Sequence, residues 1–159
     1  MKGVLLAVLA VMSSASCVSV VVLKDPLSAQ ERIDLGYLYE KEGKLELAKK
    51  EYAKAIRKDR RSWLAYYNLG NVYARRGDMQ KAQELYQRAL RIERDPDLLN
   101  NLAFVLKERG QYCQALELLE EALKKRQRVE YTQNLREVER LIANRNLDCS
   151  SLEGEGEPW

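Results

Sequence analysis

The stretch that decides the fold is WLAYYNLGNVYARRGDMQKAQELYQRA, residues 63–89. Gly77 divides it into two segments, each long enough for a helix of about three turns. Small residues recur in both segments: Gly70 lies in the first, and Ala82 and Ala89 lie one heptad apart in the second. Residues of this size let two helix backbones approach closely, so the stretch predicts a helical hairpin.

The same small residues return at a nearly constant spacing. Gly36 precedes Gly70 by 34 residues, and Ala103 follows it by 33. The two alanines also have counterparts in both neighbouring units, namely Ala48 and Ala55, and then Ala115 and Ala122. Self-similarity at this period is typical of stacked helical hairpins. We therefore expect an all-α solenoid of three units, over residues 29–62, 63–95 and 96–129.

These units resemble the tetratricopeptide repeat. The middle unit carries the family pattern as Leu69-Gly70, Tyr73, Gly77, Ala82, Tyr86 and Ala89. The first unit carries it as Leu35-Gly36, Tyr39, Gly43, Ala48, Tyr52 and Ala55, and the third keeps Leu102-Ala103, Gly110, Ala115 and Ala122. Two departures stand out, because Arg32 replaces a large apolar residue of the first unit and Leu119 replaces an aromatic residue of the third.

Three stacked hairpins would leave an apolar face open at the C-terminal end. Leu135, Val138, Leu141 and Ile142 recur there at helical spacing among charged residues. The pattern predicts a capping helix within residues 130–147.

The composition argues against most catalytic chemistry. The chain has no histidine, which is the commonest general base and metal ligand. Its three cysteines show no CxxC spacing, and the sequence contains no glycine-rich phosphate loop. We expect no enzymatic activity, no metal site and no cofactor.

The charge pattern gives no indication of nucleic-acid binding. The net charge is +3 at pH 7, and basic residues alternate with acidic ones over most of the chain. Two basic runs, 57–61 and 124–128, fall at expected helix ends, where cations complement the helix dipole. Contact with an anionic partner or a lipid headgroup is the alternative explanation.

The first residues read as an export signal. Lys2 precedes the apolar segment 3–12, and small residues follow before Cys17, so the signal is expected over residues 1–16. The Ser-Ala-Ser-Cys segment at 14–17 resembles the lipobox of bacterial lipoproteins, with Ser14 where that family usually has leucine. The resemblance implies lipidation of Cys17.

Two other versions of the N-terminus stay open. Ordinary cleavage in the same stretch would give a soluble exported protein. An uncleaved segment 3–23 carries no charge over 21 residues and is long enough to span a bilayer. All three versions place the folded part outside the cytoplasm, in the bacterial periplasm or at the outer membrane. Residues 17–28 would form a tether, and residues 148–159 a disordered tail.

If Cys17 carries lipid, Cys113 and Cys149 remain. Cys113 begins the second helix of the third unit, and Cys149 follows the capping helix. These helices should run antiparallel about a turn near residue 129, which brings residue 113 within reach of Cys149. In an oxidising compartment we expect a disulfide that staples the cap. Two free thiols are the alternative.

Tetratricopeptide proteins similar to this one bind extended or helical peptides on the concave face formed by the first helix of each unit. The resemblance implies a groove built from Ile33, Tyr37, Glu40, Lys41, Leu64, Tyr67, Asn68, Asn71, Arg75, Asn100, Asn101, Phe104, Lys107 and Glu108. Asn68 and Asn101 stand where family members often hydrogen-bond a ligand backbone. Chaperone-binding members grip a carboxylate with basic residues, which Ile33, Asp97 and Asn101 replace here, so we expect no carboxylate clamp.

The residues therefore predict an envelope scaffold that holds a peptide segment or a partner protein. Two alternatives remain. The repeats could self-associate as a homo-oligomer, or the chain could be an accessory subunit of an envelope assembly or secretion complex.

Overall fold

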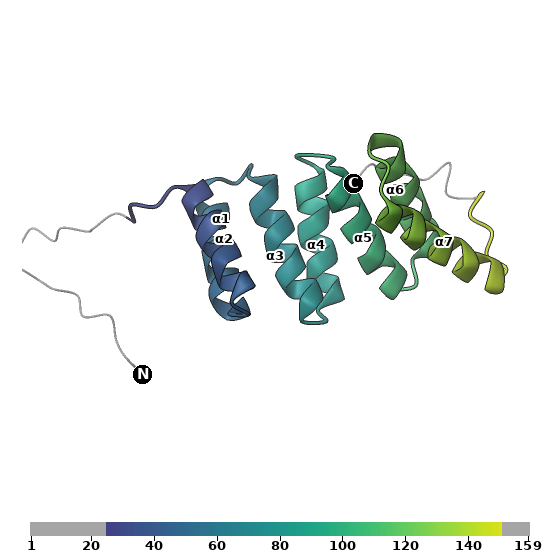
Figure 1. Ribbon diagram of the computed structural model, residues 1–159, viewed down its shortest axis with the longest axis horizontal. Helices are drawn as coiled ribbons and strands as arrows, with labels where there is room; N and C mark the ends of the chain where they lie inside the picture. Colours follow the sequence, from purple (N-terminus) through teal and green to yellow (C-terminus); the bar gives the residue numbers. More distant parts are fainter. Residues whose placement is uncertain (1–24, 151–159) are drawn as a thin grey trace, which may run out of the picture.

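The computed structural model describes residues 25–150, which fold into seven α-helices (Figure 1). These are α1 (Ala29–Lys41), α2 (Leu45–Lys58), α3 (Trp63–Arg75), α4 (Met79–Leu90), α5 (Pro96–Glu108), α6 (Tyr112–Lys125) and α7 (Val129–Asn144). Successive helices pack as hairpins, α1 with α2, α3 with α4 and α5 with α6, and α7 packs on α6. The predicted all-α solenoid of three hairpins and a capping helix is confirmed. The signal at 1–16, lipidation of Cys17 and the end of the tail lie outside the described residues.

The three hairpin turns share one geometry. Gly43, Gly77 and Gly110 follow the first helix of each pair with φ of +73°, +81° and +79°. This left-handed conformation is costly for residues with a Cβ atom, so glycine at these positions ends the first helix and allows the chain to reverse. At the other end of the hairpins, side-chain oxygens of Ser28, Ser62 and Asp95 accept hydrogen bonds from the first backbone N–H groups of α1, α3 and α5.

In each of the first two hairpins, one tyrosine ring fills the space between the two helices. A Cβ atom placed on Gly36 would lie 2.6 Å from Cε1 of Tyr52, and one on Gly70 would lie 2.5 Å from Cε1 of Tyr86. Both tyrosines are buried. The glycines of the repeat are therefore required by the rings that lie against them.

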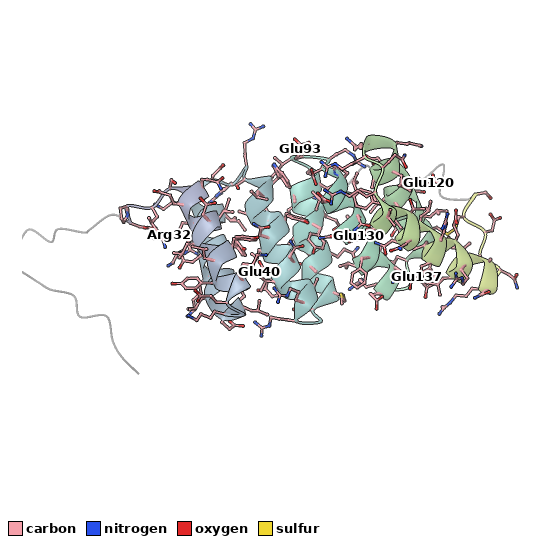
Figure 2. The ribbon with its side chains drawn as sticks, viewed as in Figure 1. Arg32, Glu40, Glu93, Glu120, Glu130 and Glu137 are labelled. Carbon is pink, nitrogen blue, oxygen red and sulfur yellow. A yellow bond between two sulfur atoms is a disulfide. The ribbon has the colours of Figure 1, made fainter. Side chains whose placement is uncertain are left out.

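The outer face of the first hairpin differs from the matching faces of the inner hairpins. Arg32 and Glu51 occupy positions that are apolar and buried one and two repeats later, where Tyr66 and Leu85, and then Leu99 and Leu118, stand. Arg32 and Glu51 are buried as well, and they form an ion pair. Arg32, labelled in Figure 2, also pairs with Asp25, and Glu51 pairs with Lys54 at 2.6 Å. Charged pairs thus close the end of the described stack.

Helix α7 closes the opposite end through polar contacts as well as apolar ones. Tyr131 and Val138 are buried against the last hairpin. The carboxylate of Asp97 at the start of α5 accepts hydrogen bonds from Arg126 at 2.9 Å, Arg128 at 3.0 Å and the hydroxyl of Tyr131. Burial and the Asp97 carboxylate raise the pKa of Tyr131 to about 12, so its hydroxyl remains a donor at neutral pH.

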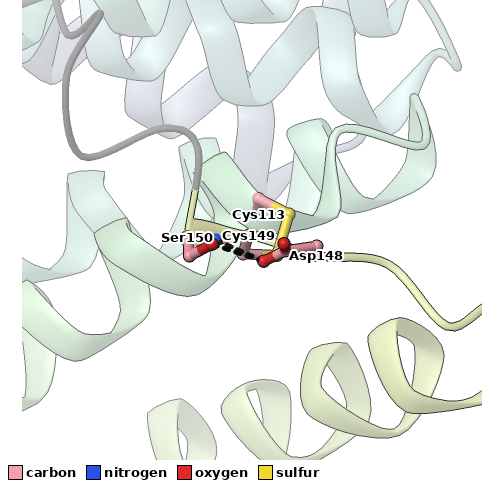
Figure 3. The surroundings of a disulfide bond; sticks show 4 residues. All are labelled: Cys113, Asp148, Cys149 and Ser150. Carbon is pink, nitrogen blue, oxygen red and sulfur yellow. Dashed lines mark hydrogen bonds between the residues drawn. A yellow bond between two sulfur atoms is a disulfide. The ribbon is translucent and has the colours of Figure 1, made fainter.

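A disulfide fastens the segment that follows α7. Helix α7 ends at Asn144, and Asn146 has a φ of +50°, which turns the chain back. Cys149 then reaches the first turn of α6, where it is bonded to Cys113 with 5.4 Å between their Cα atoms (Figure 3). Next to it, the backbone N–H of Ser150 donates to the Asp148 carboxylate at 2.9 Å. The chain beyond the cap is therefore joined to the last hairpin.

Candidate functional site

The first helices of the three pairs, α1, α3 and α5, follow one another along the solenoid (Figure 1). We call the surface they share the A-helix face. A pocket of about 300 Å³ opens on it. The pocket is lined by Glu40, Asn71, Ala74, Arg75, Tyr86, Asn101 and Phe104, so all three hairpins contribute.

Glu40, labelled in Figure 2, closes one side of the pocket. The hydroxyl of Tyr52 donates to its Oε2 at 2.9 Å, and Nη1 of Arg75 donates to its Oε1 at 2.9 Å. Both oxygens of Glu40 therefore have partners. The ion pair links the first hairpin to the second and leaves little free negative charge in the pocket.

An amide network occupies the floor. Oδ1 of Asn71 accepts from the Tyr86 hydroxyl at 2.6 Å and from Nδ2 of Asn101 at 3.1 Å. Asn101 also donates to the hydroxyl of Tyr67 at 3.0 Å. This pattern uses the oxygen of Asn71 and leaves its two N–H groups without a partner among the described residues. The pocket therefore offers donors, which suit carbonyl or carboxylate oxygens of a ligand.

Burial makes the two tyrosine hydroxyls of this network harder to ionise. It raises the pKa of Tyr86 and, despite its hydrogen bond with an asparagine amide, that of Tyr67. Tyr86 thus remains a donor at neutral pH, which fixes the orientation of the Asn71 amide.

The far side of the pocket is apolar. The Phe104 ring is 41% exposed, although the side chain is large and aromatic. Nζ of Lys107 lies 5.0 Å from the ring centroid and pairs with Glu137 of α7 at 2.9 Å. The ammonium group holds one side of the ring, and the rest is available to an apolar side chain of a ligand.

The structure brings together five of the residues expected in the groove, and Tyr67 supports them from behind. The five that line the pocket are Glu40, Asn71, Arg75, Asn101 and Phe104. Two assignments are wrong. Ile33 is 4% exposed because it packs in the apolar core. Asn100 is 3% exposed because α7 covers it, and its Oδ1 accepts from Asn134 at 2.8 Å.

The remaining expected residues lie outside the pocket lining. Tyr37 is half-exposed at the N-terminal end of the face, with Nζ of Lys41 5.1 Å from its ring centroid. Asn68 is partly buried. The side chain of Lys107 is only 11% exposed because of its ion pair with α7.

Two residues of the pocket, Tyr86 and Ala74, are absent from the groove that the resemblance implies. The ring of Tyr86 is indeed core, but its hydroxyl reaches the pocket. A signal was present, because a buried tyrosine needs a hydrogen-bond partner that a phenylalanine would not. Ala74 carries no such signal.

Within residues 25–150, no group of acidic or cysteine side chains is arranged to hold a metal ion. No helix in that range is both long and apolar enough to cross a membrane.

Two family models, both described as tetratricopeptide repeat, match residues 33–98 and 97–130. The chain belongs to the tetratricopeptide repeat (TPR) proteins. A comparison of this TPR protein with curated protein sequences found no match.

Many solved structures are similar to this TPR protein, and three of them are described here. The first TPR of Spaghetti (RPAP3), bound to the HSP90 peptide SRMEEVD, is 20% identical with a TM-score of 0.71, over 75% of this chain and 96% of that one, which supports the fold. YrrB, described as a TPR protein with an unusual peptide-binding site, is 28% identical with a TM-score of 0.68, over 74% and 60%. The pilF protein of Pseudomonas aeruginosa is 29% identical with a TM-score of 0.67, over 72% and 54%. The chain thus covers less than two thirds of the last two structures.

Proposed function

We propose that this TPR protein is a non-enzymatic interaction scaffold of the bacterial cell envelope. It binds a peptide segment of a partner protein along the A-helix face. The observation that carries the proposal is the pocket. There the N–H groups of Asn71, which have no partner among residues 25–150, and the Arg75 guanidinium lie beside the exposed Phe104 ring.

This combination fits a peptide better than a small apolar ligand. An amide N–H can donate to a backbone carbonyl, and an exposed aromatic ring can hold one side chain at low entropic cost. The peptide-binding site in the description of YrrB and the HSP90 peptide bound to the RPAP3 domain support the same use of the fold.

The bound segment is internal to its parent chain in this proposal. Ile33 is buried, and Asp97 is a carboxylate already held by Arg126 and Arg128, so neither position can supply the positive charge that a free C-terminus needs. The single guanidinium of Arg75 is shared with Glu40.

The envelope location rests on two observations. The N-terminal residues have the pattern of an export segment, as a lipoprotein signal over residues 1–16, an ordinary cleaved signal or an uncleaved span over 3–23. The Cys113–Cys149 disulfide suits an oxidising compartment. The intact mass of the mature protein distinguishes the versions, because lipidation would leave Cys17 as the first residue with the mass of several acyl chains.

Site-specific photocrosslinking in the native envelope tests the peptide-binding proposal. A photoreactive phenylalanine at position 104 should form an adduct with a partner protein. The same residue at position 117, which is exposed on α6 away from the A-helix face, is the matched control and should form none. An adduct of twice the chain mass would indicate self-association instead. Equal adducts at both positions, or none at position 104, would refute binding at this face.

A further inference from the structure

We infer that one edge of the solenoid faces an anionic membrane surface. The edge is formed by the connections α2–α3, α4–α5 and α6–α7, at the top of Figure 1, and we call residues 57–62, 88–95 and 124–128 the basic edge. These connections carry eleven basic and three acidic residues. The connections at the opposite edge, 41–46, 75–81 and 107–112, carry seven and four.

The cations of the two edges also differ in their partners. Those of the opposite edge are mostly paired, as Arg75 is with Glu40 and Lys44 is with Glu42. The basic edge has seven exposed cations that form no ion pair with a described residue: Arg57, Arg60, Arg61, Arg88, Arg91, Lys124 and Lys125. The exposed carboxylates that remain there, Asp59 and Glu93, are too few to balance them.

Helix dipoles account for only part of this surplus. Cations in the last turn of a helix, such as Arg57 and Arg88, are favoured by the dipole. Arg60 and Arg61 lie beyond the end of α2, where the dipole gives them no such role. A surface that keeps extra unpaired cations on one side suits a partner of dense negative charge.

The position of Asp25, which follows the expected export segment, favours the membrane as that partner. Nζ of Lys58 donates to the backbone carbonyl of Asp25 at 2.8 Å, and Arg32 pairs with the Asp25 carboxylate. Residue 25 is thereby held at the basic edge. The inference rests on the membrane attachment proposed above, because any anchor at or before residue 23 then tethers this edge closer to the bilayer than the other.

The tether confines the basic edge to the neighbourhood of the bilayer and lets it come within the range of electrostatic attraction. From Cys17 to Asp25 the chain can span at most roughly 28 Å when fully extended. Anionic headgroups attract basic residues only within about one Debye length, roughly 8 Å at physiological salt. In this orientation the basic edge meets the membrane and the A-helix face does not, so the A-helix face stays open to partner proteins.

Tryptophan quenching in vesicles tests this orientation with the full chain. Trp63 begins α3 at the basic edge, and a Trp159→Phe substitution leaves it as the sole tryptophan. Vesicles would contain nitroxide-headgroup lipid in phosphatidylcholine alone, or in equal parts phosphatidylcholine and phosphatidylglycerol. We expect stronger quenching of Trp63 in the anionic vesicles and loss of the difference at high salt.

Charge reversal supplies the matched controls. The Arg57→Glu, Arg60→Glu, Arg61→Glu variant should lower quenching in anionic vesicles to the level in neutral ones. A Lys50→Glu, Arg109→Glu, Arg140→Glu variant reverses as many exposed cations elsewhere and should leave the difference unchanged. Equal quenching in both vesicles, or a difference that survives reversal of the edge, would overturn the inference.

Vesicle flotation separates this inference from the anchoring proposal. A chain that floats with both vesicles but shows no charge-dependent quenching keeps its anchor and refutes the basic edge. A chain that floats only with anionic vesicles refutes a firm anchor, and it supports the basic edge as a membrane contact only if the edge reversal abolishes flotation; flotation that survives the reversal refutes the basic edge. A chain that floats with neither refutes both.

Discussion

At the scale of single residues, the size of a side chain on one helix of a hairpin limits the size of the side chain that faces it on the other helix. The first two hairpins place glycine and tyrosine at two facing positions, as Gly36 with Tyr52 and Gly70 with Tyr86. The third hairpin has Ala103 and Leu119 at the same positions of the repeat. Both pairs fill the interior, because leucine is smaller than tyrosine and leaves room for the methyl group of the alanine.

Replacing Gly70 with alanine should therefore destabilise the protein. The added Cβ would lie 2.5 Å from Cε1 of Tyr86, so we expect overpacking to lower the free energy of unfolding by about 1–3 kcal/mol. Adding Tyr86→Leu should recover part of the loss, since it recreates the pair found in the third hairpin. Urea unfolding of both single variants and the double variant measures this coupling. Strictly additive effects would contradict it.

The pocket shows which residue-level features can be predicted from sequence. Asn71 and Phe104 occupy the same position of successive repeats, and that position faces outward in both hairpins, so the repeat pattern located them. Asn100 was misplaced because its exposure depends on α7, whose fit over α5 the pattern does not contain. The pairing of Tyr86 with Asn71 depends on ring and amide orientations that no spacing encodes.

At the scale of elements, the first hairpin should be the most sensitive to acid. The hydrogen bond that Arg32 donates to Asp25 lowers the pKa of the Asp25 carboxyl group. For Glu51, burial alone would raise the pKa, but bonds with Lys54 and Arg32 more than offset it, so the net shift is downward. A carboxyl group whose pKa is lower in the folded state than in the unfolded state stabilises the fold at any pH above its unfolded-state pKa. That contribution is lost as the pH falls through the folded-state pKa.

Hydrogen exchange measures this effect helix by helix. Between pH 6 and pH 3, protection of α1 and α2 should fall more than protection of α3 and α4, after correction for intrinsic exchange rates. A Glu51→Gln variant should already show weaker protection at pH 6 and a smaller further loss. Uniform loss across both hairpins would contradict a local origin.

The cap should depend on its disulfide. Cys113 and Cys149 are separated by 36 positions, for which the chain-entropy model gives a stabilisation of about 4 kcal/mol. Replacing both cysteines with serine should lower the free energy of unfolding by about this amount. Adding a reductant should do the same to the natural chain and nothing further to the variant. Two free thiols in the mass of the unreduced natural protein would show that the bond does not form.

At the scale of the whole molecule, the repeat period predicted the number, order and pairing of the helices, because small residues must recur wherever helices cross closely. The ends of the stack were harder to predict. Arg32 departs from the repeat pattern, and nothing in that pattern marks Glu51 as its partner. Their role appears only when α1 and α2 are placed together, since each is tolerated in a buried position by the other.

Because both ends of the described stack are closed, the length of its A-helix face is fixed. A solenoid with open faces can lengthen by stacking further units or a second copy, and its footprint on a ligand grows with it. Here the ion pair of Arg32 with Glu51 closes the described stack on one side, and α7 with its disulfide closes it on the other. At about 10 Å between neighbouring helices, the axes of α1 and α5 lie roughly 20 Å apart. An extended epitope of about six residues would fill that interval, so longer linear motifs should bind no more tightly than their central hexamer.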